Sequence, residues 1–444
     1  MEELLEEIAR LRRLTEQQQK QIEALQAQVV GLTEALEEAR KAAARSAAPF
    51  RRPSSKRRKR PKKPGRKKGH PGESREPPRT VTETIVVPLA RCPHCGDELT
   101  DVRPIEQLIE DFEVVLRVLR LVTHRGTCAG CGTVRSTHPR QQSRASGAAA
   151  NQLGPRSLAM ALDLNKRLGL PLRKTCDVMQ THLGITMSPG GLFQAQARLA
   201  QRLQPAYEQV VERVRGSPSV NVDETGWWVG EPNWWLWVFV TDDDVLYHVD
   251  ERRNREVLDE ILGDYQGVLG SDCLAAYESM PCRQQKCYAH HLKAIRLAKD
   301  TRPDDPDGFL EEMTSLLREA LLIGRVRDDI GPERLNRAIG SLEHRAHQWL
   351  SRSYEQPALQ RVRNRLWKRR EHLFTFLRET RVDATNNAAE RALRPAVIAR
   401  KLSCGNRTDR GRRTFQTLMT LATNAHRRGE SFRDLIESAV RLPA

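Results

Sequence analysis

The sequence contains no apolar run that approaches the ~20 residues needed to cross a bilayer. Its N-terminus is acidic and amphipathic, and it lacks the continuous apolar stretch of a signal peptide. Acidic residues are also missing between positions 39 and 72, where fifteen lysines and arginines occur. The first two absences argue against a membrane protein and predict a soluble, cytoplasmic one, while the third points to a polyanionic partner.

Basic residues outnumber acidic residues by 74 to 57, which gives a formal net charge of +17 and a pI near 9.8. Much of this excess lies in residues 46–80, whose proline, glycine and basic residues cannot bury a core. We therefore expect a basic disordered linker or arm that contacts double-stranded DNA. A solvated linker without specific contacts is the alternative. The candidate DNA-contacting residues of the arm are Arg57, Arg58, Lys59, Arg60, Lys62, Lys63, Arg66, Lys67 and Lys68.

Residues 1–45 carry a heptad repeat, with apolar residues such as Ile22 and Leu25 at the a and d positions. Several such heptads predict a coiled coil that joins copies of the chain, most simply as a homodimer. Thr15 and Gln18 interrupt the apolar seam and can fix its register. A single amphipathic helix packed on its own domain is the alternative.

Two C-x-x-C pairs stand thirty-two residues apart, at Cys92, Cys95, Cys128 and Cys131. Each pair can present two thiolates to one tetrahedral ion, so the pattern predicts one structural Zn²⁺. Either His94 or His124 could replace a thiolate. Between the pairs, the β-branched residues of 112–123 predict a strand, and we interpret residues 81–145 as a zinc ribbon.

Residues 146–216 read as a helical DNA-binding domain. A short helix is expected over 172–183, a turn beginning at Gly184 follows, and Ser188 then caps the next helix. This is the spacing of a helix-turn-helix. A helical hairpin that only packs is equally compatible with the pattern. The candidate base-reading residues on the second helix are Gln194, Gln196 and Arg198.

Three acids stand in chemically suggestive places. Asp223 ends one predicted strand, Asp272 ends another, and Glu390 lies one turn into a helix. The order from residue 219 is three strands, helix, strand, helix, strand and helix, which is that of a ribonuclease H-like α/β fold. The core would comprise 217–300 and 383–444, with an all-helical insertion at 301–382 between them.

Convergent carboxylates on rigid elements suit Mg²⁺ or Mn²⁺, and two such ions can clamp a phosphoryl transfer. Taken singly, each acid has a structural explanation, since Asp223 and Asp272 could end or cap elements and Glu390 could pair along its helix. Their joint occurrence in this fold order favours the metal site. Pro395 is expected to bend or end the helix of Glu390.

Aromatic residues form only 5% of the chain, yet five of the seven tryptophans lie between Trp227 and Trp237. Such alternating rings mostly pack a core, although exposed ones could stack on unpaired bases. A second zinc could be imagined at Cys282, Cys287, His290 and His291, but we prefer plain core cysteines. His290 is also a candidate phosphate contact, and a structural histidine is the alternative.

Four motifs carry a family resemblance: Val-Asp-Glu-Thr at 222–225, Gly-Ser-Asp-Cys-Leu-Ala-Ala-Tyr at 270–277, Cys-Tyr-Ala-His at 287–290 and Asn-Asn-Ala-Ala-Glu-Arg-Ala-Leu-Arg-Pro at 386–395. They closely resemble the catalytic blocks of bacterial transposases of the insertion-sequence sixty-six family. The resemblance implies a D-D-E triad of Asp223, Asp272 and Glu390 with two Mg²⁺ ions per active site. Thr385 and Cys273 depart from the family's usual residues, but neither is a proposed ligand.

The resemblance implies that the protein binds terminal inverted repeats and catalyses metal-dependent DNA cleavage and strand transfer. It also implies a location at the nucleoid of a bacterial cytoplasm. Accessory transposition proteins are further candidate partners, and Arg391 and Arg394 beside the third acid are candidate DNA contacts. Two other functions fit the motifs less fully. One is a zinc-ribbon DNA-binding regulator without catalysis, and the other is a ribonuclease H-like nuclease or resolvase.

Overall fold

The computed structural model describes residues 18–19, 21–22, 25, 78, 80–142, 145, 147–301 and 303–440. The chain divides into two compact units, Met1–Glu113 and Val114–Ala444. Nearly all of the expected coiled coil at 1–45 and of the basic linker at 46–80, with all nine candidate DNA-contacting residues of the arm, lies outside the described residues. Both expectations therefore stay predictions.

The first unit contains the first C-x-x-C pair in a tight turn. An antiparallel bridge between Arg91 and Glu98 closes the turn. Inside it, the Cys92 N–H donates to the Asp97 carbonyl at 2.9 Å and the Gly96 N–H donates to the Cys92 carbonyl at 2.9 Å. Gly96 has a φ of +83°, a backbone conformation that glycine adopts without steric cost.

The expected strand at 112–123 is wrong, because these residues form no regular strand. β-branched side chains favour a strand only when a neighbouring strand supplies the ladder, and none of the described strands pairs with this segment. Instead, the second C-x-x-C pair lies in the turn of a short hairpin. Its strands, β1 (Arg125–Cys128) and β2 (Gly132–Arg135), pair antiparallel with Cys128 opposite Gly132.

Helices follow the hairpin as the sequence predicts. The turn after α3 begins at Gly184, whose φ is +64°. The Ser188 Oγ accepts the Gly191 N–H at 3.0 Å and caps α4. Both helices thus lie where the sequence predicts them, and a DNA-binding helix-turn-helix stays a prediction. These elements are a 3₁₀ turn at Gly147–Ala150, α2 (Pro155–Leu162), a π-helical turn at Asp163–Arg167, α3 (Leu172–Leu183), α4 (Pro189–Arg202) and α5 (Gln204–Arg215).

A five-stranded mixed sheet forms the centre of the second unit, in the order β5-β4-β3-β6-β7. β3 is central: it pairs antiparallel with β4 and parallel with β6. Contrary to the sequence-based expectation, β3 does not end near Asp223, because β4 continues to pair with it as far as Val229. The strands are β3 (Ser219–Val229), β4 (Glu231–Val240), β5 (Val245–Asp250), β6 (Val268–Ser271) and β7 (Arg283–Lys286).

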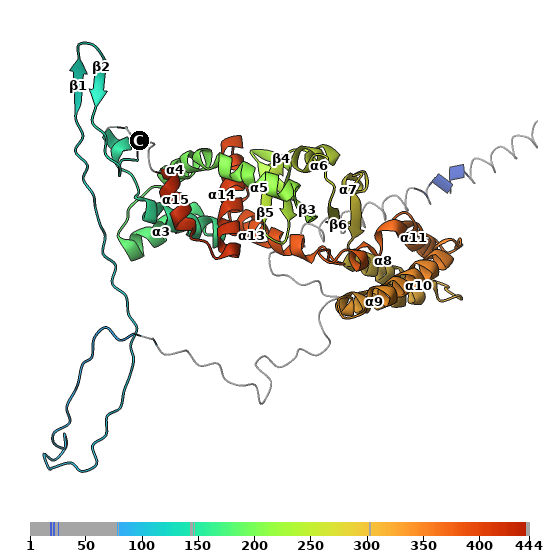
Figure 1. Cartoon of the computed structure of the whole chain (residues 1–444), viewed down its shortest axis with the longest axis horizontal. Coiled ribbons are helices and arrows are strands. Elements are labelled where there is room, and N and C mark those ends of the chain that lie inside the picture. Colours follow the sequence, from blue (N-terminus) through green and yellow to red (C-terminus); the bar gives the residue numbers. More distant parts are fainter. Residues whose placement is uncertain are drawn as a thin grey trace, which may run out of the picture. The chain divides into compact units, whose positions relative to one another are not determined.

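Helices connect the later strands and build the insertion. α9, α10 and α11 pack with α8 into a helical group (Figure 1). The described residues between 303 and 382 form helices and turns and no strand, while the division of the chain into a core and an insertion at 301–382 stays a prediction. The elements are α6 (Arg255–Leu262), α7 (Ala275–Glu278), α8 (Tyr288–Asp300), α9 (Phe309–Val326), α10 (Pro332–Leu350), α11 (Pro357–Trp367), a 3₁₀ turn at Arg370–His372 and α12 (Thr375–Arg378).

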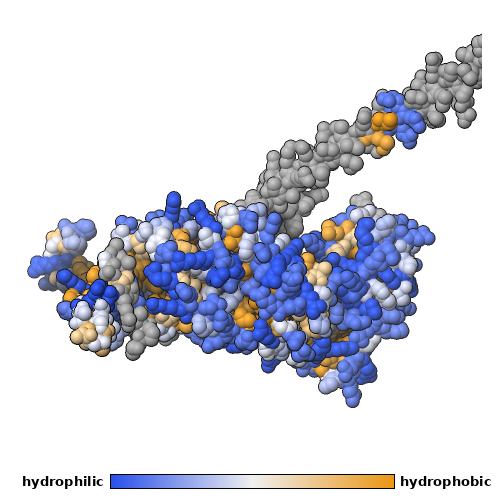
Figure 2. Space-filling model, turned by 90° about the horizontal axis from the view of Figure 1, so that it is seen from above, coloured by the Kyte–Doolittle hydropathy of each residue, from blue (hydrophilic) through white to orange (hydrophobic). Residues whose placement is uncertain are grey.

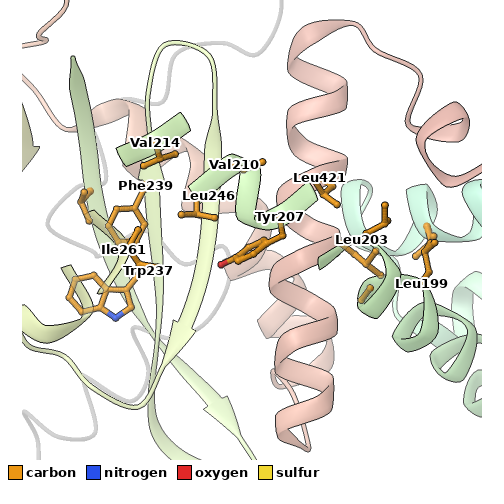
Figure 3. Packing of buried hydrophobic residues seen from close by; sticks show 14 of the residues in the cluster. Leu199, Leu203, Tyr207, Val210, Val214, Trp237, Phe239, Leu246, Ile261 and Leu421 are labelled. Atoms are coloured by element: carbon orange, nitrogen blue, oxygen red, sulfur yellow. The ribbon is translucent and has the colours of Figure 1, made fainter. Parts of the chain in front are cut away.

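The main hydrophobic core joins the first helices to the sheet. Figure 3 shows Tyr207 and Val210 of α5 beside Leu246 of β5, with Phe239 of β4 close by. These four side chains are almost fully buried, and burial of apolar area of this kind is the main source of stability. The Tyr207 hydroxyl is satisfied inside the core because it donates to the Tyr247 carbonyl at 3.1 Å.

The chain ends in α13 (Asn387–Ser403), α14 (Asp409–Arg428) and α15 (Phe432–Val440). Of the two effects expected of Pro395, it does not end α13, because the helix continues for two more turns to Ser403. Proline removes one N–H donor from the helix. Its ring lies on the exposed side of α13, where water can hydrogen-bond the freed carbonyl.

α14 covers the outer edge of the sheet with side-chain hydrogen bonds. Asn424 accepts the Val245 N–H at 2.7 Å and donates to the Val245 carbonyl at 3.0 Å. One turn earlier, Thr420 accepts the Tyr247 N–H at 3.0 Å. The remaining two bonds, at successive four-residue steps, are Gln416 with the Val249 N–H and Arg412 with the Val249 carbonyl. Side chains of α14 thus replace a neighbouring strand along β5.

The face seen in Figure 2 is mostly hydrophilic, with smaller apolar areas among the hydrophilic residues. Exposed apolar residues also occur in runs, such as Ile85, Val86 and Val87. Among the described helices, none has the length and apolarity needed to cross a membrane.

Candidate active site

Two of the predicted acids lie on the same side of the sheet's strand ends because β3 and β6 are parallel neighbours. Asn221 of β3 is in register with Gly270 of β6. Asp223 lies two residues beyond the first and Asp272 two residues beyond the second. A Cβ at Gly270 would lie 2.5 Å from the Asn221 Nδ2, so a larger residue there would displace the Asn221 side chain.

Asn386 holds the helix of the third acid close to Asp223 on β3. Its Oδ1 accepts the Asn221 Nδ2 at 2.9 Å, and its own Nδ2 donates to the Val222 carbonyl at 2.8 Å. Asn386 is 1% exposed and directly precedes α13, where Glu390 occupies the first turn. Because both hydrogen bonds end on β3, they fix the start of α13 against the strand that carries Asp223.

The three carboxylates interact electrostatically. Burial and, to a smaller extent, the negative charges of Glu224, Asp272 and Glu390 together raise the pKa of Asp223 to about 7, although the Glu224 N–H lowers it. A half-buried carboxylate among other carboxylates is stabilised by a cation, so these residues fit an oxygen-coordinated divalent ion. In the described part of the chain, the three acids are not all within 4.8 Å of one another.

Glu224, although adjacent to Asp223, has a different environment. Its Oε1 accepts two hydrogen bonds from Arg253, at 2.7 and 3.1 Å, and its Oε2 accepts the Tyr277 hydroxyl. The Glu224 side chain is only 3% exposed. The Glu224 carboxylate is therefore already paired with a guanidinium, whereas Asp223 forms no ion pair with a described basic residue.

The helical insertion supports the loop that follows Asp272. Arg369 contacts Glu278 of α7 and also donates to the Cys273 carbonyl at 3.5 Å. Lys368 forms a second ion pair with Glu278 at 2.6 Å. The Asp272 Oδ1 accepts the Leu274 N–H at 2.8 Å, which orients the carboxylate within this loop.

A buried lysine lies beneath the same loop. Lys286 is fully buried, and its Nζ donates to the Ser271 Oγ at 2.9 Å, next to Asp272 in sequence. Burial lowers the pKa of Lys286 to about 8. Nearby, burial lowers the pKa of His291 to about 3, and neither of its buried ring nitrogens has a hydrogen-bond partner in the part of the chain that the structure describes.

Cys287 and His290 lie next to Glu390. The Cys287 Sγ accepts the Asn386 N–H at 3.2 Å. Burial alone would raise the pKa of the Cys287 thiol, but the His290 imidazole and the Asn386 N–H outweigh it and lower the pKa. His290 is half-buried, whereas Arg391 and Arg394 are exposed on α13. The last two are free to meet a phosphate backbone.

Other predicted side chains divide between surface and core. Gln196 cannot read DNA bases, because it is 1% exposed and its Nε2 donates to the Asn165 Oδ1 at 3.1 Å. Gln194 and Arg198 are exposed. Of the clustered tryptophans, Trp227 and Trp237 are buried in the core as expected. The others, Trp228, Trp234 and Trp235, are half-buried.

The four zinc-pattern cysteines belong to two units that are described separately. Within each turn, backbone N–H groups lower the pKa of the first thiol: those of Cys95 and His94 for Cys92, and those of Cys131 and Gly130 for Cys128. Each turn thus favours the thiolate form that a zinc ligand needs. The joint four-cysteine site stays a prediction.

Sequence reasoning missed the residues that hold the acids in place. Asn386 was part of a recognised motif, but its role depends on contacts with β3 that no local pattern reveals. Arg369 and Lys286 gave no signal beyond ordinary basic residues. Asn221 could have been suspected, because a polar side chain two residues before an acid on a central strand needs a partner.

A mixed five-stranded sheet with a central first strand, and an acid on each of β3, the β6 end and a late helix, defines a D-D-E-type α/β core. The family model described as "Transposase IS66 family" matches residues 151–414. The chain belongs to this family of transposases.

Similar proteins occur in Sinorhizobium fredii. The uncharacterized protein y4qI is 26% identical over 292 residues, which cover 57% of this chain and 52% of y4qI. The uncharacterized proteins y4hP and y4jD are each 24% identical, over 76% and 77% of this chain and 68% and 73% of their own lengths. The chain thus aligns with about half of the length of y4qI.

Proposed function

We propose that this protein is a DNA transposase that cleaves DNA at the ends of an insertion sequence and joins the cut ends to a target. The proposal assigns Asp223, Asp272 and Glu390 as the catalytic, metal-binding acids. The observation that carries it is the state of Asp223, a half-buried carboxylate whose pKa is raised to about 7 by burial and by the neighbouring acids. Such an arrangement is costly for a fold and useful for cation binding.

The same three residues would hold the divalent ions, Mg²⁺ or Mn²⁺. When bound, such ions acidify a water or a DNA 3′-hydroxyl and stabilise the leaving 3′-oxygen. Asp223 must lose its proton before it can act as a ligand, so its raised pKa makes ion binding release a proton near neutral pH. Glu224 stays bound to Arg253 and does not take part.

Positively charged groups beside the acids would orient the DNA. Arg391 and Arg394 are exposed on the helix that carries Glu390, and His290 lies at the start of α8. The proximity of Cys287, Asp272 and Glu390 raises the pKa of His290 although burial lowers it, which favours the charged imidazolium. We propose that these three residues contact phosphate groups at the cleaved end.

The other parts of the chain would provide binding and assembly. We propose that the exposed Gln194 and Arg198 of α4, together with the basic arm at 46–80, contact the terminal repeats. Residues 1–45 would pair two chains. Cys92, Cys95, Cys128 and Cys131 would bind one structural Zn²⁺, and metal analysis should find one equivalent that is lost in Cys128→Ser.

Two alternatives remain to be separated from this proposal. A DNA-binding regulator would use the acids only structurally, but Asp223 makes no ion pair with any described basic residue, whereas Glu224 does. A nuclease of the same fold would cleave DNA without joining it.

An assay with a pre-cut transposon end and a labelled target plasmid distinguishes the three functions. Joined product in Mg²⁺ is expected for the native protein, and none for Asp223→Asn, Asp272→Asn or Glu390→Gln. Hydrolysis without joining would favour the nuclease. If the three variants act like the native protein, the acids have no catalytic role.

A further inference from the structure

We propose that Cys287, His290 and Glu390 form a second kind of metal site, one for a thiophilic transition ion of the zinc class. A thiol sulphur, an imidazole nitrogen and a carboxylate oxygen of these residues all lie within 4.8 Å of one another. Sulphur and nitrogen ligands select Zn²⁺ or Co²⁺ over Mg²⁺, which prefers oxygen. The site therefore differs in chemistry from the all-carboxylate site that shares Glu390.

The three ligands lie on rigid elements that are tied together. The Cys287 N–H donates to the Ser271 carbonyl at 2.9 Å, directly after β7. His290 follows in the first turn of α8, and its N–H donates to the Cys287 carbonyl at 3.1 Å. The Glu390 N–H donates to the Asn386 carbonyl at 3.1 Å, while the Asn386 N–H donates to the Cys287 Sγ. Binding an ion would need little rearrangement, and this lowers its free-energy cost.

Two further observations point to a ligand at this place. Among the described residues, the buried His290 Nδ1 has no hydrogen-bond partner, which is costly for an imidazole nitrogen unless something binds it. The Asn386 N–H directed at Cys287 stabilises a thiolate, the form of cysteine that binds metal. Three protein ligands would leave one tetrahedral position for water or for a DNA oxygen.

The consequence for activity rests on the proposed function. Glu390 would serve both sites, so an ion held by Cys287 and His290 would draw the Glu390 carboxylate away from Asp223 and Asp272. Low concentrations of Zn²⁺ should therefore inhibit DNA cleavage even when Mg²⁺ is abundant. The protein would cleave DNA only where free zinc is scarce.

Cobalt spectroscopy tests the site without any DNA reaction. The full-length protein is stripped of metal and titrated with Co²⁺, and thiolate-to-cobalt charge-transfer absorption is followed in the near ultraviolet. The four cysteines of the C-x-x-C pairs contribute equally in every variant. Cys287→Ser is expected to lose one Co²⁺ equivalent relative to the native protein, whereas the matched control Cys282→Ser, also near β7, should lose none. Equal equivalents in Cys287→Ser and the native protein would overturn the proposal.

A second pair of variants guards against misfolding of Cys287→Ser. His290→Gln and Glu390→Gln keep the thiol but remove one ligand each, so Co²⁺ affinity at this site should fall by at least about tenfold in both. Unchanged affinity in both would overturn the site. In the native protein, cleavage in Mg²⁺ should fall as Zn²⁺ fills the site, and unchanged cleavage with the site filled would overturn the competition for Glu390. A protein that binds Co²⁺ here but never cleaves DNA would refute only the transposase function.

Discussion

The Asn221 side chain donates a hydrogen bond of 2.9 Å to the Asn386 side chain and thereby joins the central strand to the helix of the third acid. Asn386→Ala should leave Asn221 and the Val222 carbonyl without these partners inside the protein. Loss of two buried hydrogen bonds is expected to lower the free energy of unfolding by about 2–4 kcal/mol. DNA cleavage should fall more steeply than stability, because Glu390 loses its fixed position.

Asn387→Ala is the matched control, since Asn387 is the next residue along the chain and is exposed. Denaturant unfolding and a cleavage assay on folded protein measure the two effects. If both alanine variants behave alike, the Asn221–Asn386 bond does not position the third acid.

Asp223 should make the metal-free protein less stable as the pH rises. Its pKa is about 7 in the folded protein against 3.8 as the ordinary value, so the folded state binds the proton more tightly. The corresponding stability is complete at low pH and is lost as the pH rises through about 7. In chelator, the native protein should therefore lose on the order of 2–4 kcal/mol relative to Asp223→Asn between pH about 4 and about 8.

Added Mg²⁺ should restore most of this loss at pH about 8 in the native protein and little in Asp223→Asn, because only a carboxylate attracts the ion. Asp243→Asn, at an exposed turn, is the control and should follow the native curve. Parallel pH profiles for the native protein and Asp223→Asn would contradict the raised pKa.

The insertion should matter for activity through Arg369. This residue is 9% exposed and holds the loop after Asp272 through Glu278 and the Cys273 carbonyl. Arg369→Met leaves the half-buried Glu278 carboxylate with Lys368 alone, and we expect a loss of about 2–4 kcal/mol in stability and a marked loss of cleavage. Arg370→Met changes the exposed neighbouring residue. It should alter the free energy of unfolding by no more than about 0.5 kcal/mol and should leave the cleavage rate unchanged. Thermal unfolding and cleavage rates of the two variants decide the point.

The basic arm should govern how DNA affinity depends on salt. Twelve lysines and arginines lie between positions 51 and 68. Each phosphate neutralised adds about 0.9 to the slope of log K against log salt. Deleting residues 51–68 should weaken binding to every DNA sequence and flatten this slope. Deleting residues 1–45 should instead lower the molecular mass of the oligomer in solution, without changing the affinity for a single DNA end. An unchanged slope in the first deletion would remove the arm from the DNA interface.

The order of elements could be predicted from the sequence because each element has a local signature. The helix at 172–183 is predicted by its apolar spacing and flanking residues, and the order of elements from β3 to α8 is predicted by the alternation of strand and helix patterns. The three acids could be predicted as site residues because each lies directly after, or within, one of these elements. These inferences need only residues near one another in the chain.

What could not be predicted depends on contacts between distant segments. Asn386 meets Asn221, and Arg369 meets Glu278, only after the insertion has folded back onto the sheet. The burial of Gln196 likewise depends on which helix packs against its face. The segment at 112–123 failed for the opposite reason: its side chains favour a strand, but a strand also needs a partner.

The side chains of α14 that satisfy β5 also limit how copies of this protein can meet. Along β5 they occupy the backbone groups that a strand of another molecule would need. At the opposite edge, the Gln284 carbonyl of β7 accepts the Thr375 hydroxyl, and the Gln285 side chain accepts the Phe376 N–H. The sheet therefore cannot be extended by a second copy along β5, and any contact between copies has to use other surfaces.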